Sequence, residues 1–295
     1  MRVLIIGGTK FIGPHVVTEL ANQGHKITVF HRGENEAPLP DAVRHVRSPR
    51  AAMPVVQFPR EVLDPAPDVV IHMIPMGEAD TRAAVEAFRG RTRRLVALSS
   101  GDVYLAYGRL TGFEPGPVED GLLTEDSPLR SKLYPYRAQA KIPSELAYYY
   151  EKILVERVAR EAPDLPATIL RLPKVYGAGN NADLATVHQA REFPDWRWTH
   201  GYVENVAHAI ALAAVHPAAE GRIYNVGEEY TPTVAERLRD LPPPAVEIQA
   251  KSLNYAQNIA YDTGRIRREI GFHERIDYSE GLRRTLRLPD GRGAE

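Results

Sequence analysis

The chain begins Met1-Arg-Val-Leu-Ile-Ile-Gly-Gly-Thr-Lys-Phe-Ile-Gly13, an apolar run at residues 3–6 that leads directly into a glycine-rich turn. A helical pattern of apolar residues follows at about 14–24. A strand, a tight turn and a helix in this order direct backbone N–H groups and a helix N-terminus at an anion, such as the pyrophosphate of a dinucleotide. We therefore expect a dinucleotide site formed by Gly7, Gly8, Thr9, Lys10, Phe11, Ile12 and Gly13.

Lys10 departs from the usual pattern of this turn, which has a glycine at the middle position. The middle glycine normally lets the backbone approach the pyrophosphate closely. The Lys10 side chain must therefore point away from the ligand or lay its ammonium group along a phosphate. An ordinary turn between a strand and a helix, needing only small residues, is the alternative interpretation of the same stretch.

The composition excludes several classes of protein. The net charge is −1, which provides no positive field for binding nucleic acid. Cysteine is absent, so disulfides and thiol chemistry are excluded, and we expect a cytoplasmic protein. No apolar run is long enough to cross a membrane, and the N-terminus enters a strand without room for a signal peptide.

The first 175 residues alternate between strand-like and helical patterns. The strand-like runs are 3–6, 26–30, 43–46, 69–74, 94–99 and 167–172, and the helical patterns lie around 14–24, 80–90 and 144–162. Because most of these apolar runs are nearly continuous, the strands are expected to be buried on both faces. The pattern predicts an α/β fold, a doubly wound Rossmann domain with a parallel sheet between two layers of helices.

The pattern becomes irregular after residue 177. We expect a helix at 202–216, a strand and turn at 221–227, a strand at 246–250, and helices at 262–271 and 278–287 with N-caps at Asp262 and Ser279. We interpret 1–177 as the dinucleotide-binding domain, to which 201–227 returns. Most of 178–295 then forms a small substrate-binding lobe over the carboxyl ends of the strands.

Three further segments resemble segments of a known family. They are Val96-Ala-Leu-Ser-Ser-Gly-Asp-Val-Tyr104, Tyr148-Tyr-Tyr-Glu-Lys-Ile-Leu-Val-Glu156 and Ile169-Leu-Arg-Leu-Pro-Lys-Val-Tyr-Gly177. Together with the opening turn, they resemble the extended short-chain dehydrogenase/reductases, the NAD-dependent epimerase/dehydratase family. The variant of the glycine turn looks most like an atypical branch that includes the chloroplast stem-loop-binding proteins.

The resemblance implies that Tyr148 exchanges a proton with the substrate. It also implies that Lys152 lowers the pKa of that tyrosine and holds the nicotinamide ribose, while Ser100 orients the substrate oxygen. A free phenol has a pKa near 10, so it needs a nearby ammonium group to act as a base. Tyr148 and Lys152 have the spacing that places two side chains on one helix face. Packing of the three consecutive tyrosines is the alternative interpretation.

The end of the second strand bears on the choice of cofactor. His31 stands where an NAD-preferring protein usually has an acidic residue for the ribose 2′-hydroxyl, and Arg32 follows. An arginine binds a 2′-phosphate bidentately, so NADP is slightly favoured over NAD. A solvent-facing arginine at a strand end is the simpler alternative.

Two more positions concern the substrate. Asp102 lies where related dehydratases have the second acid of a pair, but Gly101 replaces the first acid, so dehydration is disfavoured. Asp102 serves either as a single acid or as a turn residue. Lys174 replaces an asparagine that contacts nucleotide sugars in related enzymes, and a lysine there suits a phosphate or carboxylate.

We therefore expect an NAD(P)-dependent epimerase or reductase that transfers hydride to or from a small hydroxyl or carbonyl compound, such as a sugar or sugar nucleotide. The alternatives are a regulatory protein that binds a dinucleotide without chemistry and, less favoured, an RNA-binding protein of the stem-loop-binding type. The histidine spacing predicts no metal site. Family members often dimerise through the helix that carries the tyrosine and the lysine, so a homodimer is a candidate assembly.

Overall fold

A seven-stranded parallel sheet forms the centre of the molecule. The computed structural model describes residues 1–34, 37–48, 53–182, 184–244, 248–249 and 251–287. The strand order β3-β2-β1-β4-β5-β6-β9 has its crossover between β1 and β4, as in dinucleotide-binding folds. The strands are β1 (Arg2–Ile6), β2 (Lys26–His31), β3 (Arg44–Arg47), β4 (Val69–His72), β5 (Arg94–Ser100), β6 (Ala167–Leu172) and β9 (Ile223–Asn225), while β7 (Lys174–Tyr176) and β8 (His200–Tyr202) form a separate parallel pair.

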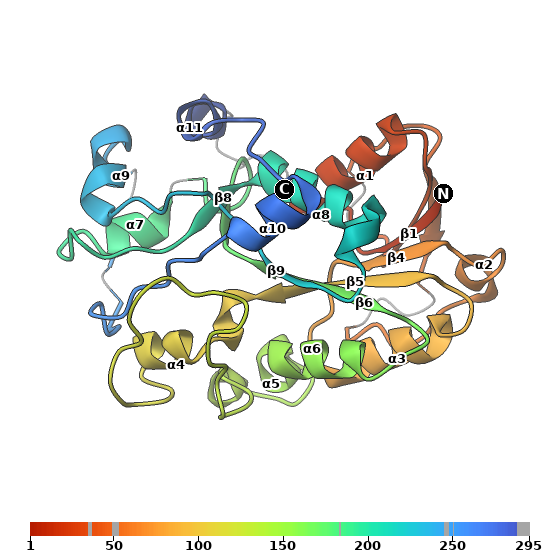
Figure 1. Cartoon of the computed structure of the whole chain (residues 1–295), viewed down its shortest axis with the longest axis horizontal. Helices are drawn as coiled ribbons and strands as arrows, with labels where there is room; N and C mark the ends of the chain where they lie inside the picture. Colours follow the sequence, from red (N-terminus) through yellow and green to blue (C-terminus); the bar gives the residue numbers. More distant parts are fainter. Residues whose placement is uncertain (35–36, 49–52, 183, 245–247, 250, 288–295) are drawn as a thin grey trace.

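Helices cover both faces of this sheet (Figure 1). They are α1 (Ile12–Asn22), α2 (Arg60–Leu63), α3 (Glu78–Phe88), α4 (Leu105–Thr111), α5 (Leu146–Tyr149), α6 (Lys152–Arg160), α7 (Ala185–Gln189), α8 (Val203–Val215), α9 (Val234–Asp240), α10 (Gly264–Ile270) and α11 (Tyr278–Arg287), with short 3-10 turns at η1 (Gly101–Val103), η2 (Arg137–Gln139) and η3 (Pro217–Ala219). Helices α1, α8 and α10 lie on one face, and α2, α3 and α6 lie on the other. The predicted doubly wound architecture is confirmed.

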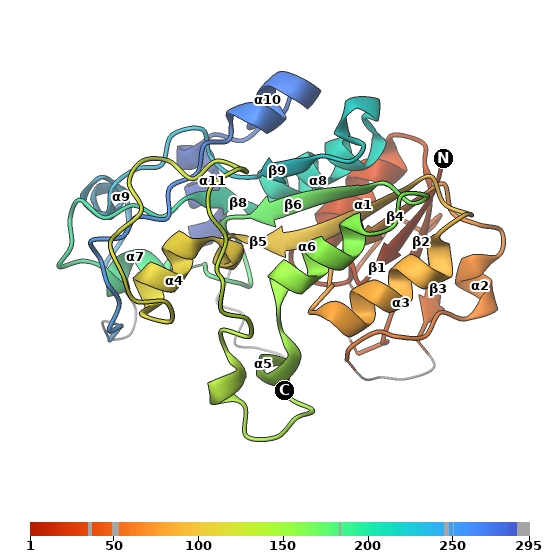
Figure 2. The same ribbon diagram turned by 60° about the horizontal axis from the view of Figure 1, so that its bottom comes forward.

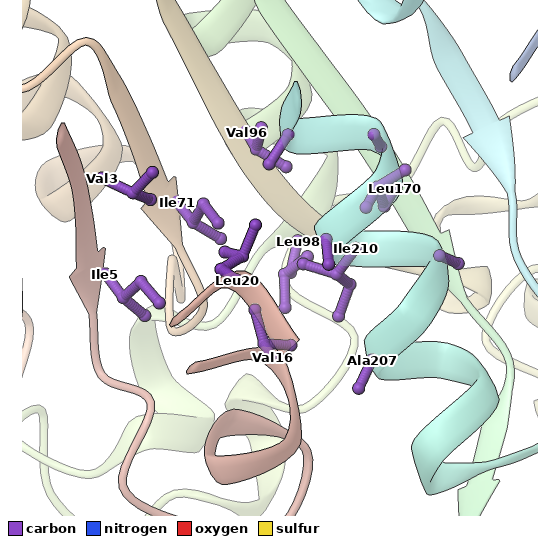
Figure 3. Packing of buried hydrophobic residues seen from close by; sticks show 14 of the residues in the cluster. Val3, Ile5, Val16, Leu20, Ile71, Val96, Leu98, Leu170, Ala207 and Ile210 are labelled. Carbon is purple, nitrogen blue, oxygen red and sulfur yellow. The ribbon is translucent and has the colours of Figure 1, made fainter. Parts of the chain in front are cut away.

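The alternation of side chains along each strand divides the core into two layers. Val3 and Ile5 of β1 pack with α1 and α8 on one face, whereas Leu4 and Ile6 pack with α3 and α6 on the other. Figure 3 shows the first layer, in which strand side chains meet Val16 and other residues of the two helices. Burial on both faces explains why the strands read as continuous apolar runs rather than as alternating ones.

The segments after β6 take two different positions. Helix α8 packs in the same core layer as α1, and β9 pairs with β6 at the edge of the main sheet. The lobe elements α4, α7 and α9 lie beyond the ends to which the arrows of β5 and β6 point (Figure 2). Their apolar side chains form a third cluster around Tyr104 and Trp196. The lobe therefore stands at the carboxyl ends of the strands, where ligands of such folds bind.

Some sequence-based boundaries need correction. The helix predicted at 144–162 is two helices, α5 and α6, separated at Tyr150 and Glu151. The cap predicted at Ser279 is Asp277, whose Oδ1 accepts the backbone N–H of Glu280 at 2.9 Å. Most of the strand predicted at 246–250 lies outside the described residues. Helices α4, α7 and α9 and the pair β7–β8 were not predicted.

Candidate active site

The opening turn lines a pocket of about 270 Å³ at the carboxyl ends of β1, β2 and β4. The lining residues are Gly7, Gly8, Thr9, Lys10, Phe11, Ile12, Phe30, His31, Arg32, Gly33, Glu34, Ser48, Val55, Met73, Ile74, Leu98 and Leu172. Nine residues at the ends of β1 and β2 were expected to bind the cofactor: residues 7–13, His31 and Arg32. Eight of them line this pocket. The exception, Gly13, stands behind the turn.

The glycines of the turn are required by its backbone. Gly7 and Gly8 have φ angles of 91° and 90°, a region that favours glycine. A Cβ at Gly13 would lie 2.4 Å from the Cα of Gly8, so the first turn of α1 touches the loop directly. Phe11, at the N-cap of α1, supplies no side-chain hydrogen bond to the helix. No side chain therefore caps the N-terminus of α1, and Ile12 at its first position lines the pocket, which suits a pyrophosphate.

Basic side chains surround the end of β2. His31 Nδ1 accepts the backbone N–H of Gly33 at 3.2 Å, and its Nε2 lies 3.1 Å from His45 Nδ1. Arg32 forms an ion pair with Glu34 at 2.9 Å. Sequence reasoning did not consider Glu34, which competes for the guanidinium group that a 2′-phosphate would need.

The break between α5 and α6 is caused by a buried ion pair. Glu151, fully buried, is the N-cap of α6 and accepts the backbone N–H of Ile153 at 2.9 Å. Its Oε1 also accepts Nη2 of Arg130 at 3.0 Å, and Arg130 is buried too. Because this carboxylate is drawn into the core, the backbone at Tyr150 and Glu151 is extended rather than helical. Tyr148 and Lys152 consequently do not share one helix.

Tyr148 lies on the outer side of α5. Its side chain is 37% exposed. The Arg137 guanidinium carbon lies 4.7 Å from the centre of the Tyr148 ring, and Arg137 Nε donates to the Tyr148 carbonyl at 2.8 Å. In the described part of the chain, the structure gives the Tyr148 hydroxyl no contact with Ser100 or Lys152. The expected proton-transfer role of Tyr148 remains a prediction.

The structure brings a different tyrosine, Tyr150, to Asp102. The Tyr150 hydroxyl donates to Asp102 Oδ2 at 2.8 Å, and the Ser100 side chain acts to lower the pKa of Tyr150 against the larger effect of burial. Ser100 Oγ in turn accepts the backbone N–H of Asp102 at 3.4 Å, which begins η1. Tyr136 donates to the same Asp102 oxygen at 3.3 Å. Sequence reasoning named Ser100 and Asp102 but missed Tyr150 and Tyr136.

Lys152 connects this cluster to the pocket. Its Nζ donates to the carbonyl oxygens of Leu98, at 3.1 Å, and of Pro75. Leu98 itself lines the pocket of the glycine turn. The ammonium group lies 5.5 Å from the centre of the Tyr150 ring. Burial lowers the pKa of Lys152 to about 8, against the opposing effect of the Asp102 carboxylate.

Lys174 lies farther from the glycine turn, at the start of β7. Its Nζ is 5.8 Å from the centre of the Trp198 ring, and Trp198 packs edge-on against Tyr107. The Tyr107 hydroxyl lies 2.9 Å from that of Tyr136, so these aromatic side chains link Lys174 to the Asp102 cluster. Burial lowers the pKa of Lys174, and the nearby Lys251 lowers it further. Among the described residues no carboxylate forms an ion pair with Lys174.

The described residues offer neither a metal-ion cluster nor a membrane-spanning helix. Residues 1–34, 37–48, 53–182, 184–244, 248–249 and 251–287 contain no group of three or more His, Asp or Glu side chains arranged to hold a metal ion. Within the same ranges, no helix has the length and apolar character that crossing a membrane requires.

Comparison with known proteins gives three kinds of likeness. Residues 3–227 match the NAD dependent epimerase/dehydratase family. The 2′-dehydrokanamycin reductase of Streptomyces kanamyceticus is 30% identical over 186 residues, which is 62% of this chain and 45% of that protein. This chain thus spans less than half the length of that curated relative.

Solved structures share the fold at low sequence identity. The UDP-glucose 4-epimerase of Thermotoga maritima, solved with UDP-glucose, has a TM-score of 0.70 at 18% identity over 97% of both chains. The UDP-glucuronic acid 4-epimerase of Bacillus cereus, solved with UDP-glucuronic acid and NAD, also has a TM-score of 0.70, at 16% identity over 97% of this chain and 98% of that one. Likeness at this level concerns the arrangement of the backbone.

Proposed function

The chain belongs to the NAD dependent epimerase/dehydratase family, and on this premise we propose that it is an NAD(P)-dependent epimerase or reductase acting on an anionic sugar or sugar nucleotide. One observation carries the proposal: the pocket of the glycine turn and the cluster of Ser100, Asp102 and Tyr150 meet at Leu98 and Lys152. A dinucleotide held by the turn and a substrate oxygen held by the cluster would therefore be neighbours.

The residues present fit a nicotinamide dinucleotide. Gly7, Gly8 and the N-terminus of α1 would hold the pyrophosphate, because Phe11 supplies no side-chain cap and Gly7, Gly8 and Ile12 line the pocket. Lys152 would stand near the nicotinamide end, because it donates to the carbonyl of Leu98, which lines the pocket. When bound, the nicotinamide accepts or returns a hydride, which this chain's own side chains cannot do.

The basic residues at the end of β2 support a preference for NADP. Arg32 and the pair His31–His45 place positive or protonatable groups where an NAD-preferring protein has an acid. Glu34 weakens this preference, because a bound 2′-phosphate would have to compete with its ion pair to Arg32.

Lys174 and Lys251 support an anionic substrate. The Lys174 ammonium group lies over the Trp198 ring, Lys251 is near enough to lower the pKa of Lys174, and among the described residues Lys174 has no carboxylate partner. A phosphate or a sugar carboxylate would neutralise both charges, and the Trp198 ring would pack against an adjoining sugar or base. The contacts from Trp198 through Tyr107 and Tyr136 then lead from that anion to Asp102, near which the reacting oxygen would lie.

Several expectations from the sequence remain proposals. Ser100 would orient the substrate oxygen, Tyr148 would move the proton and Lys152 would lower the pKa of Tyr148; Tyr150, which the sequence did not suggest, is a second candidate for the proton transfer. We also propose the division into a dinucleotide-binding domain, 1–177 with 201–227, and a substrate lobe in the rest of 178–295, and a cytoplasmic location. The exposed apolar side chains of Ile142 and Leu146 beside α5 support a homodimer, which the mass measured by light scattering would test.

The proposal is tested by binding first and turnover second. NADH and NADPH are titrated against the protein and followed by nicotinamide fluorescence. UDP-glucuronic acid, UDP-glucose and uncharged glucose are then incubated with the protein and NAD or NADP, and the products are separated by chromatography. We expect binding of both nucleotides and turnover of a charged substrate only. If neither nucleotide binds, the proposal fails; binding without turnover across a wider sugar-nucleotide panel would favour the regulatory alternative.

A further inference from the structure

The neighbourhood of Tyr150 differs from that of a tyrosine activated by lysine. A tyrosine that works as a phenolate needs a positive group beside its oxygen. Here Lys152 donates to the carbonyls of Pro75 and Leu98 instead. The partner of the Tyr150 oxygen is the Asp102 carboxylate at 2.8 Å, and both burial and this negative charge raise the pKa of Tyr150 well above 10. Such a phenol does not ionise to a phenolate. It gives up its proton only when its oxygen accepts a second proton at the same time.

Asp102 is built to exchange a proton. The residue is buried, and its Oδ2 receives the hydroxyls of Tyr150 and Tyr136. Its Oδ1 is buried and has no hydrogen-bond partner among the described residues. Burying a carboxylate with one oxygen that has no hydrogen-bond partner costs free energy. Protonation of either oxygen removes the charge and lowers that cost. Burial accordingly raises the pKa of Asp102.

Other charged groups act to lower the pKa of Asp102, against the effect of burial. Arg130, which donates to the Asp102 backbone carbonyl, and Lys152 both favour the carboxylate. The buried Glu151 opposes them. The Tyr150 hydroxyl also stabilises the carboxylate by donating to it. Arg130, Lys152 and the Tyr150 hydroxyl therefore oppose the effect of burial, which raises the pKa of Asp102.

We infer that Tyr150, rather than Tyr148, exchanges the proton with the substrate oxygen, and that Asp102 supplies or receives that proton through the Tyr150 hydroxyl. When the substrate is oxidised, its O–H bond breaks and its proton passes to Tyr150 Oη, while the proton of Tyr150 passes to Asp102 Oδ2. The hydride from the substrate carbon would go to the oxidised nicotinamide when that cofactor is bound, which balances the step. Reduction of a carbonyl reverses both proton transfers. This inference rests on the proposed function for its substrate.

The first test needs no substrate. The carboxyl C=O band of Asp102 is followed by infrared difference spectroscopy through a pH titration, with D102N identifying the band. In Tyr150→Phe the carboxylate loses a donor, so we expect the midpoint of the titration to move to higher pH. The matched substitution Tyr148→Phe, two residues away and also losing one oxygen, should leave the midpoint in place. An unchanged midpoint in Tyr150→Phe would overturn the inference.

The second test separates proton transfer from a structural role. With UDP-glucuronic acid as the probe, Tyr150→Phe should lower kcat by roughly 10² to 10³, with KM within about threefold of the wild type. D102N should remove the Asp102 limb of the pH profile. The rate in mixtures of H₂O and D₂O should depend on deuterium content along a curve, because two protons move together. Tyr230→Phe, at an exposed tyrosine of the lobe, is the control for loss of a phenol oxygen.

The outcomes distinguish this inference from the proposed function. Each variant is first checked for NADPH binding and for a wild-type circular dichroism spectrum. A wild type that binds no nucleotide would remove the proposed function, while the infrared titration still decides whether Tyr150 and Asp102 share a proton. A wild type that turns over the probe, with Tyr148→Phe inactive and Tyr150→Phe active, would overturn the inference and leave the proposed function standing.

Discussion

The two ends of the site are held in place by different means. The glycine turn is fixed by its own backbone, since Gly13 touches Gly8 and the neighbouring strands pair on both sides of β1. The tyrosine segment is fixed by side chains from elsewhere, above all by Arg130 bound to Glu151. A local backbone motif keeps its geometry wherever its glycines are present. A pair of residues spaced along a helix, such as Tyr148 and Lys152, keeps its geometry only while side chains from other segments leave that helix unbroken.

The largest expected effect is at Glu151. Glu151→Ala would leave the Arg130 charge buried without its carboxylate and remove the N-cap of α6. We expect the free energy of unfolding to fall by about 3–5 kcal/mol, measured by urea denaturation. Glu161→Ala, in an exposed ion pair with Arg82, is the control and should change it by less than about 0.5 kcal/mol. Equal effects at the two sites would show that the tyrosine segment does not depend on the buried pair.

The corresponding change at the other end is Gly13→Ala. The new Cβ would lie 2.4 Å from the Gly8 backbone, which cannot move aside as a flexible side chain can. We expect a loss of about 1–3 kcal/mol in the free energy of unfolding and at least a tenfold weaker NADPH affinity. Gly24→Ala meets no atom within 4 Å and bears only the strain of its φ angle of 81°, so its NADPH affinity should match the wild type. Similar affinities in both variants would contradict the role of the turn.

His72 connects the two ends and gives a pH-dependent prediction. It pairs with Ile6 of β1 at the end of β4, lies near Lys152, and neither ring nitrogen has a partner among the described residues. Burial lowers the pKa of His72 to about 3, from 6.5. Below pH 6.5 the unfolded chain therefore gains a proton that the folded chain refuses. The stability that His72 contributes is present above pH 6.5 and is lost as the pH falls toward 3.

The measurement compares His72→Leu with the wild type over this pH range. The variant should lose stability less steeply on acidification, by about 1.4 kcal/mol per pH unit well below pH 6.5. His273→Leu, at an exposed histidine, provides the matched control. Parallel stability curves for His72→Leu and the wild type would mean that His72 takes up its proton in the folded state.

The smallest expected effect is at Arg32. Arg32→Gln should weaken NADPH binding by about tenfold, equivalent to about 1.4 kcal/mol, with little change for NADH, because the 2′-phosphate would lose a bidentate partner. Glu34→Gln is the opposing variant: releasing Arg32 from its ion pair should tighten NADPH binding. If Arg32→Gln weakens both nucleotides alike, Arg32 is not a discriminating residue.

The same contrast explains which parts of the structure follow from the sequence. Strands such as β1 and β6 were predicted within one residue, because continuous apolar runs and flanking turns are local signals. The break at Glu151 was missed because its cause, Arg130, lies twenty-one residues earlier in an irregular loop. For that reason Tyr150 was overlooked. In contrast, α9 carried a readable signal, the capping box of Thr233 and Glu236.

The late return of β9 to the sheet has a consequence for synthesis. The edge of β6 ends at Leu172, and its partner begins only at Ile223, after the β7–β8 pair and α8 have been made. At roughly 5–20 residues per second, a ribosome would leave that edge unpaired for about 3–10 s. An unpaired strand edge recruits other chains. The length of the segment between β6 and β9 thus sets how long the β6 edge stays unpaired during synthesis. A chain that ends before Ile223 would keep this edge free to pair with other chains.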